Sequence, residues 1–166
     1  MLSINRFGSL VLAGLCVYAL ASPASAQLIQ HKDLSASMAL TIAETTIATC
    51  KTNGYNVSVT VVGRNGEIIV QVRGDNTGPH TIENSMRKAY TAFTTRNSTA
   101  EMAKRAQPGL SGFMLLDKIT PIEGGLPIFA GKDLVGSVGI SGAPGGEKDA
   151  ACAQVGIDKI AKGLAG

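Results

Sequence analysis

A tight turn between two alternating segments is the feature that most constrains the fold. In the first segment, residues 55–62, valines alternate with Ser58 and Thr60. The second segment, residues 67–73, follows after the turn residues Asn65-Gly66. Alternation of apolar and polar side chains is typical of a strand that is buried on one face. Asparagine and glycine both accept the positive φ that a two-residue hairpin turn needs. The sequence therefore predicts a β-hairpin, and with it an antiparallel sheet.

A second hairpin is predicted in the C-terminal half of the chain. Residues 126–130 and 134–141 are mainly apolar and flank Gly131-Lys132, as the two strands of a hairpin flank their turn. Residues 110–123 are expected to add a short strand ahead of Gly124-Gly125. The expected sheet then has about five strands, a common size for a sheet in a globular domain.

Four segments carry the signals of helices. Residues 33–52 repeat apolar side chains every three or four positions and stop at Asn53-Gly54, since glycine is favoured just beyond a helix end. The other three are residues 81–95, a short helix that begins at the capping box Ser98-x-x-Glu101, and residues 147–164. In residues 81–95 the apolar stripe expected to face the core is Ile82, Met86, Ala89 and Phe93. Because helices must cover the faces of the sheet, the predicted fold class is α+β, in layers.

The first 26 residues have the pattern of a secretory signal peptide. Arg6 is followed by the apolar residues 9–20, and Ala24-Ser-Ala26 is the small-residue pattern that a signal peptidase reads. The alternative is an anchor that is not cleaved. We expect a mature chain that begins at Gln27, forms one domain over residues 27–166 and is periplasmic or secreted. No stretch after residue 26 is long and apolar enough to span a bilayer.

Composition excludes a nucleic-acid-binding protein. The net charge is only +3 and the basic residues are scattered along the chain, so no stripe of positive charge is available for a phosphate backbone. Aromatic residues make up 4% of the chain and tryptophan is absent, which leaves little surface for the stacking of bases.

Two cysteines, Cys50 and Cys152, remain after the predicted signal peptide. An exported protein can form a disulfide, and a bridge would join the helix at residues 33–52 to the last helix. The alternative is two free, buried thiols, since cysteine packs well as a small hydrophobic residue.

The sequence contains no recognisable catalytic constellation. Neither His-Glu-x-x-His nor Gly-x-Ser-x-Gly occurs, so the motifs of zinc proteases and serine hydrolases are absent. Ser141 is interpreted as a structural serine at a strand end. Residues 142–146 are interpreted as a glycine-rich turn rather than a phosphate-binding loop, because the loop lacks Lys-Ser/Thr, and because Glu147 and Asp149 would repel an anion. No catalytic residue is assigned.

His80 is the strongest candidate for a ligand-binding residue. It follows Gly78-Pro79 and directly precedes the helix predicted at residues 81–95, which favours exposure. A neutral imidazole can bind a metal ion or a haem iron. The alternative is that His80 is a capping or solvated loop histidine. His31 lies near the predicted mature N-terminus, where chains are often disordered, and is a poorer candidate.

Basic residues lie near His80 in the sequence. They are Arg73, Arg87 and Lys88. Guanidinium and ammonium groups pair with carboxylates, such as the propionates of haem. Arg73 and Arg87 are therefore candidate partners of a ligand held by His80.

Several segments together match a known family. The most specific match runs from Val135-Gly-Ser-Val-Gly-Ile-Ser-Gly-Ala-Pro-Gly-Gly-Glu-Lys-Asp149 into Cys152-Ala-Gln-Val-Gly156, and the supporting ones are Asn53-Gly-Tyr-Asn-Val-Ser-Val-Thr-Val-Val62, Arg87-Lys-Ala-Tyr-Thr-Ala92 and Gly124-Gly-Leu-Pro-Ile128. With these segments the chain resembles the GlcG/HbpS-like family of haem-binding or haem-degrading proteins. The resemblance covers nearly all of the predicted mature chain.

The resemblance implies a profilin-like α/β sandwich that assembles into homo-oligomers and, in some members, binds haem non-covalently. The segment Gly78-Pro-His-Thr-Ile82 resembles the loop of exported members, which makes His80 a candidate contact to haem. We expect an exported protein that stores, buffers or relays haem, with His80 as the iron ligand and Arg73 or Arg87 beside the propionates. Haem is then the expected cofactor, bound without a covalent attachment.

Two other functions remain open at this point. The first is an enzyme that degrades haem or acts on another small molecule, and a catalysed product would distinguish it. The second is an accessory protein that binds an exported partner, such as the outer domain of a sensor kinase. Failure to bind haem at a defined stoichiometry would favour this second function. Both alternatives remain open because fold and family alone do not fix an activity.

Overall fold

The computed structural model describes residues 27–106 and 111–165, so the predicted signal peptide lies outside the described residues. Residues 27–30 have no regular secondary structure. The elements that follow are α1 (Ala36–Thr52), β1 (Ser58–Val62), β2 (Ile68–Val72), α2 (His80–Thr95), α3 (Thr99–Arg105), α4 (Ser111–Met114), β3 (Gly125–Ala130), β4 (Asp133–Ser141), α5 (Gly146–Lys159) and α6 (Ala161–Leu164).

The sheet is antiparallel, with the strand order β2-β1-β4-β3. Both predicted hairpins are present, β1 with β2 and β3 with β4, and the two central strands place Val59 opposite Ile140. The fold is thus α+β as predicted, with helices on an antiparallel sheet.

The expected strand count was wrong, since the described residues form four strands rather than five. In residues 111–123 the structure has the short helix α4 and irregular backbone. The Thr120 N–H donates to Thr91 Oγ1 over 2.9 Å, so a side chain of α2 satisfies this backbone group instead of a neighbouring strand. A segment held in this way does not extend the sheet.

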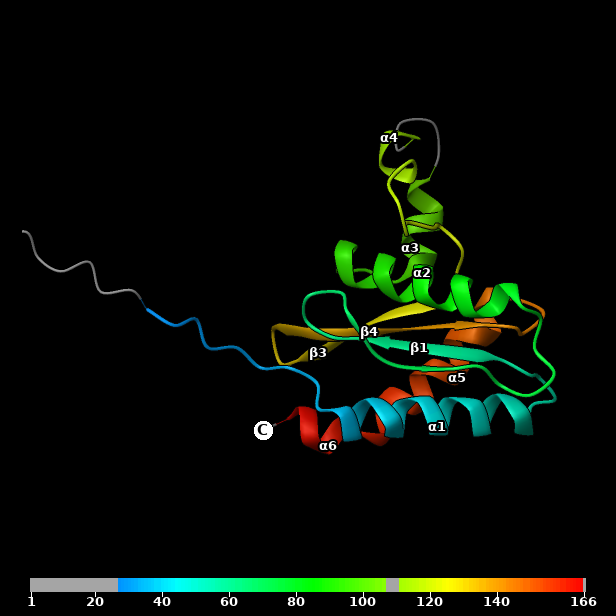
Figure 1. The fold of residues 1–166 in the computed structure, drawn as a ribbon, viewed down its shortest axis with the longest axis horizontal. Helices are drawn as coiled ribbons and strands as arrows, with labels where there is room; N and C mark the ends of the chain where they lie inside the picture. Colours follow the sequence, from blue (N-terminus) through cyan, green and yellow to red (C-terminus); the bar gives the residue numbers. More distant parts are fainter. Residues whose placement is uncertain (1–26, 107–110, 166) are drawn as a thin grey trace, which may run out of the picture. The chain divides into compact units, whose positions relative to one another are not determined.

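The apolar core lies between the sheet and the helices α1 and α5. These two helices pack against each other and against the same sheet face, while α2 covers the opposite face (Figure 1). Ile42 of α1 and Val59, Val61, Val138 and Ile140 of the central strands have no exposed surface. The alternating valines predicted for the first strand therefore do face the core.

The second face of β1 is buried as well, against expectation. Ser58 and Thr60 lie under α2, where the Ser58 and Thr81 hydroxyls are 2.7 Å apart. Serine and threonine can be buried at little cost when each hydroxyl finds a partner. Small residues also let the helix approach closely, because a Cβ on Gly139 would lie 2.1 Å from the Ser85 carbonyl oxygen.

The apolar stripe predicted to face the core from α2 was also wrong, because the helix packs on the hydroxyl-bearing face of the sheet. Of its four residues only Ala89 is buried, and Ile82, Met86 and Phe93 are half-buried. The buried face consists of Thr81, Ser85, Lys88, Ala89, Thr91 and Ala92. These small or polar side chains are complementary to the hydroxyl-bearing face of the sheet. Apolar periodicity therefore located the helix but not the face that packs.

The C-terminal helix is shorter than predicted. α5 ends at Lys159, and the buried Ile160 separates it from α6.

The other predicted helices begin close to their expected starts. The helices α1 and α2 begin within three residues of the predicted positions, and the Ser98 hydroxyl caps α3 by accepting from the Glu101 N–H. In the described part of the chain, no helix has the length and apolar character needed to cross a membrane.

Candidate functional site

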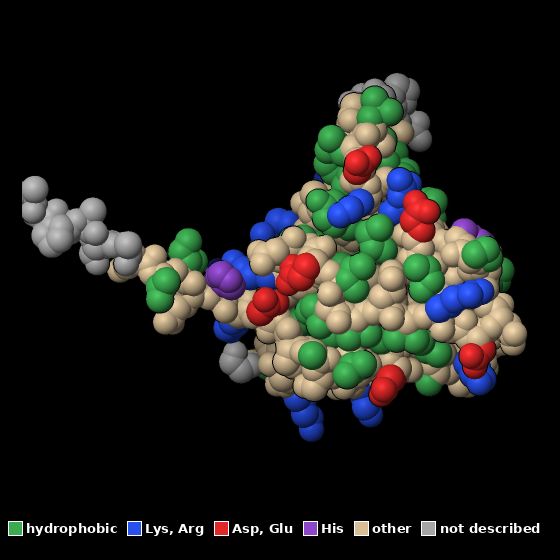
Figure 2. Space-filling view, in the orientation of Figure 1, with side chains coloured by type: hydrophobic (Ala, Val, Ile, Leu, Met, Phe, Trp, Pro, Cys, Tyr) green, Lys and Arg blue, Asp and Glu red, His purple; other side chains and the backbone are tan. Residues whose placement is uncertain are grey.

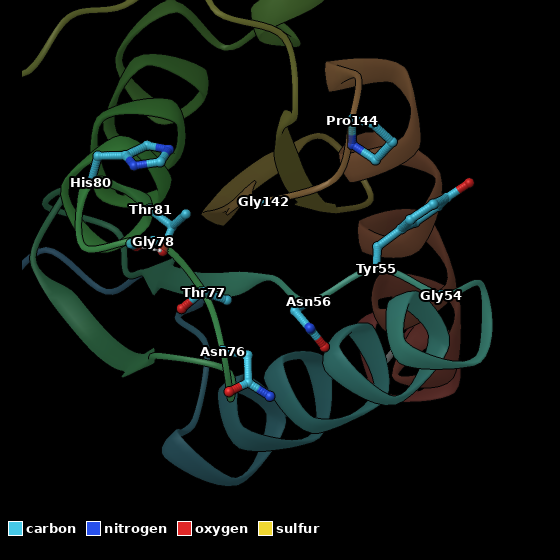
Figure 3. Close-up of a pocket in the computed structure, with 10 residues that line it drawn as sticks. All are labelled: Gly54, Tyr55, Asn56, Asn76, Thr77, Gly78, His80, Thr81, Gly142 and Pro144. Carbon is cyan, nitrogen blue, oxygen red and sulfur yellow. Dashed lines mark hydrogen bonds between the residues drawn. The ribbon is translucent and has the colours of Figure 1, made fainter.

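A pocket of about 500 Å³ lies at the sheet end where α2 begins and β4 ends. Three segments form its walls: the one after α1, the loop before α2, and the turn between β4 and α5 (Figure 3). The residues that line it are Gly54, Tyr55, Asn56, Asn76, Thr77, Gly78, His80, Thr81, Gly142 and Pro144. Its volume lies in the range of small-molecule sites.

The first wall follows from the way α1 ends. Gly54 has a φ of +83°, and the Tyr55 N–H donates to the Cys50 carbonyl over 2.9 Å. This is the stop that Asn53-Gly54 predicted. Tyr55 is half-buried, with the Lys148 ammonium 5.4 Å from its ring centroid. In Figure 3 the Tyr55 ring points away from His80.

A disulfide between Cys50 and Cys152 lies behind this wall. It joins α1 to α5 with the two Cα atoms 5.5 Å apart, and both cysteines are buried. The same Cys50 accepts the Tyr55 hydrogen bond through its carbonyl group. The covalent link therefore fixes the end of α1 from which the first wall starts.

The second wall is the loop before α2, and Arg73 helps to hold it. Arg73 Nη2 donates to the Thr77 carbonyl oxygen over 2.8 Å, and the Thr77 hydroxyl donates to the Gly74 carbonyl over 2.9 Å. Arg73 is exposed but is not among the residues that line the pocket. The Arg73 guanidinium thus contacts the lining residue Thr77 without lining the pocket itself.

His80 is exposed at the first turn of α2, within the pocket lining. Its ring lies over Gly78, since a Cβ at that glycine would be 2.9 Å from His80 Nδ1. The helix start has no side-chain cap, so His80 is not a capping residue. Among the described residues, no hydrogen bond or ion pair to the imidazole is found, and Figure 3 shows the ring extending toward the Pro144 side.

The third wall is the turn after β4. Gly142 has a φ of +139°, and a Cβ there would lie 2.3 Å from the Asn56 carbonyl oxygen. Glycine is thus required both for the backbone conformation and for the close approach of the first wall. The next residue, Ala143, donates its N–H to Asp149 Oδ1 over 3.0 Å.

Asp149 belongs to a buried ion pair that sequence reasoning missed. Its Oδ2 lies 2.8 Å from Lys88 Nζ, and the side chains are 3% and 2% exposed. Burial raises the pKa of the Asp149 carboxyl above its ordinary value, while the Lys88 ammonium opposes that shift. Lys88 is therefore not available to a ligand, contrary to its earlier grouping with the basic residues near His80. The sequence signal that could have indicated the burial of Lys88 is its helical spacing from Thr81 and Ser85, which places the three side chains on one face of α2.

Arg87 lies apart from the pocket. It pairs with Glu83 one turn earlier on α2, at 3.3 Å, and it is not a lining residue. The structure therefore brings His80 and the Arg73-held loop together but leaves Arg87 outside. On the face shown in Figure 2, basic and acidic side chains are interspersed rather than gathered by sign. The described residues hold no group of three His, Cys, Asp or Glu side chains able to bind a metal ion.

Comparison with known proteins identifies the family. The model of the family described as "Haem degrading protein HbpS-like" matches residues 34–158. The chain belongs to the HbpS-like family. Protein GlcG of Escherichia coli (strain K12) is 30% identical over 108 residues, which cover 65% of this chain and 81% of that protein.

Solved structures of other proteins share the fold. The crystal structure of HbpS has a TM-score of 0.76 and 34% identity, and the match covers 81% of this chain and 94% of that chain. The crystal structure of a PduOC:heme complex has a TM-score of 0.70 and 25% identity, covering 76% of this chain and 94% of that chain. That second protein therefore holds haem on the same framework.

Proposed function

We propose that this protein binds haem non-covalently in the pocket beside His80. The observation that carries the proposal is an exposed imidazole in the lining of a pocket of about 500 Å³, with no hydrogen-bond or ion-pair partner among the described residues. Membership of the HbpS-like family and the fold shared with the PduOC:heme complex support haem as the ligand.

The residues of the pocket fit a haem group in their chemistry. An iron that already has its porphyrin nitrogens needs an axial ligand from the protein, and His80 offers a nitrogen. Tyr55 and Pro144 contribute apolar surface, while the Arg73 guanidinium lies beside the Thr77 wall as the nearest predicted partner for a propionate. When bound, haem would supply redox and oxygen chemistry that the side chains cannot.

The wider role is part of the same proposal. We propose that the protein is exported after removal of residues 1–26, works as a homo-oligomer, and stores, buffers or relays haem. The disulfide between Cys50 and Cys152 supports an oxidising compartment, because such bonds are rare in reducing cytosol.

A haemin titration of the protein that begins at Gln27 tests the proposal. We expect a saturable change in the Soret region at a defined stoichiometry. His80→Ala should shift the Soret maximum and weaken binding by at least about tenfold, because loss of the ligand itself costs no less than loss of a group that supports a metal ligand. His31→Ala is the matched control, because His31 is exposed and outside the pocket, and it should titrate like the wild type. A shallow curve that does not saturate would overturn haem binding, and equal affinity and spectra of His80→Ala and the wild type would overturn the ligand assignment.

A further inference from the structure

A buried ion pair lies behind the third wall of the pocket. Lys88 and Asp149 are nearly inaccessible to solvent, and their charged atoms lie 2.8 Å apart. Removing two charges from water carries a penalty that their attraction offsets only when the remaining hydrogen-bonding groups are satisfied as well. A buried ion pair is therefore weak evidence of a stabilising role. The other hydrogen bonds of Lys88 and Asp149 are the better guide to the role of the pair.

Those contacts lead to the pocket wall. Lys88 Nζ also donates to the Ile140 carbonyl over 2.7 Å, which ties α2 to the end of β4. Asp149 uses Oδ2 for Lys88 and accepts the Ala143 N–H with Oδ1. One carboxylate thus joins the ammonium of α2 to the backbone of the turn. Lys88 fixes which oxygen faces Ala143.

The turn needs an anchor of this kind. Pro144 has no N–H to donate, and Gly142 adopts a backbone conformation that other residues rarely reach. The N-terminal turn of α5 is held separately, by the Lys148 and Asp149 N–H groups that donate to the Gly145 carbonyl. The segment between Gly142 and Pro144 is therefore attached to the protein interior through Ala143, by its N–H hydrogen bond to Asp149 and by the packing of its side chain against the apolar core.

We propose that Asp149, held in place by Lys88, is a positioning residue that fixes the Gly142–Pro144 wall and thereby sets the affinity of the pocket for haem. This inference rests on the proposed function, since it concerns the same ligand. It assigns to two buried residues, neither of which lines the pocket, control over a wall that faces His80 (Figure 3).

Two double variants isolate the hydrogen bond from the ion pair. Lys88→Met with Asp149→Asn removes both charges but keeps a side-chain oxygen that can accept from the Ala143 N–H. Lys88→Met with Asp149→Leu removes the same charges and the acceptor. We expect the Leu variant to bind haemin about fivefold more weakly than the Asn variant, the factor that corresponds to one hydrogen bond. We also expect faster hydrogen exchange of the Ala143 amide in the haem-free Leu variant.

The two readouts separate this inference from the proposed function. Equal haemin affinity of the two folded variants would overturn it, whatever the exchange rates are. If the wild type itself fails to bind haemin, the proposed function fails, and faster exchange of Ala143 in the Leu variant would still support the anchoring of the wall. Asp149→Glu serves if the Leu variant does not fold, since it keeps the charge but shifts the carboxylate. Wild-type affinity and wild-type Ala143 exchange in Asp149→Glu would overturn the proposal.

Discussion

The Thr60 hydroxyl lies 2.8 Å from the Ser85 hydroxyl, in the middle of the contact between the sheet and α2. Ser85 Oγ also donates to the Ile82 carbonyl over 2.9 Å, and Gln71 Nε2 donates to Thr60 Oγ1 over 2.8 Å. With its own proton given to Ile82, the Ser85 hydroxyl accepts from Thr60. The two residues therefore form one connected polar unit in a buried interface.

This relationship predicts coupling between substitutions at the two positions. Ser85→Ala leaves the buried Thr60 hydroxyl without its acceptor, and should lower the free energy of unfolding by about 1–3 kcal/mol. Thr60→Val with Ser85→Ala replaces both partners by apolar groups of similar shape. The double variant should lose less stability than the sum of the two single variants, by about 1 kcal/mol. Urea unfolding of all four proteins measures this, and strict additivity would contradict a direct hydrogen bond.

The disulfide should contribute strongly to stability. Cys50 and Cys152 are separated by 102 positions in the sequence, and closing a long loop restricts the unfolded chain. Cys50→Ala with Cys152→Ala should lower the free energy of unfolding by about 2–5 kcal/mol, the usual effect of removing a native disulfide. Unfolding in denaturant with and without dithiothreitol is the measurement. The reductant should destabilise the wild type and leave the double variant unchanged, and the same midpoint for the oxidised wild type and the double variant would contradict the prediction.

The sequence was sufficient for both hairpins and for the helices α1, α2, α3 and α5, because its signals there are local. The turn at Asn65-Gly66, the stop at Asn53-Gly54 and the cap at Ser98 each depend on the conformation of a few neighbouring residues. The burial of Ser58 and Thr60 depends instead on α2, which follows later in the chain and covers them with its own small side chains. Apolar periodicity cannot reveal a face that packs through hydroxyl pairs.

The candidate site was predictable only in part, for a related physical reason. His80 could be singled out because imidazole chemistry depends on the residue itself. The partner of Lys88 lies 61 positions away, and the first wall approaches the third through a backbone contact between Asn56 and Gly142. Such juxtapositions arise from the tertiary fold, so the pocket and the anchor behind it emerged only from the structure.

The contact between Gly78 and the His80 ring predicts a change in the site that leaves the fold intact. A Cβ at position 78 would lie 2.8 Å from His80 Cε1, and the three nearest atoms all belong to that side chain. Gly78→Ala should therefore displace the imidazole rather than the backbone, and stability should change by less than about 0.5 kcal/mol. Haemin should then bind more weakly than to the wild type, with an altered Soret maximum. Gly112→Ala is the control, because a Cβ there meets no atom within 4 Å. If the haemin titration of Gly78→Ala matches that of the wild type, ligand binding does not depend on the observed position of the His80 ring.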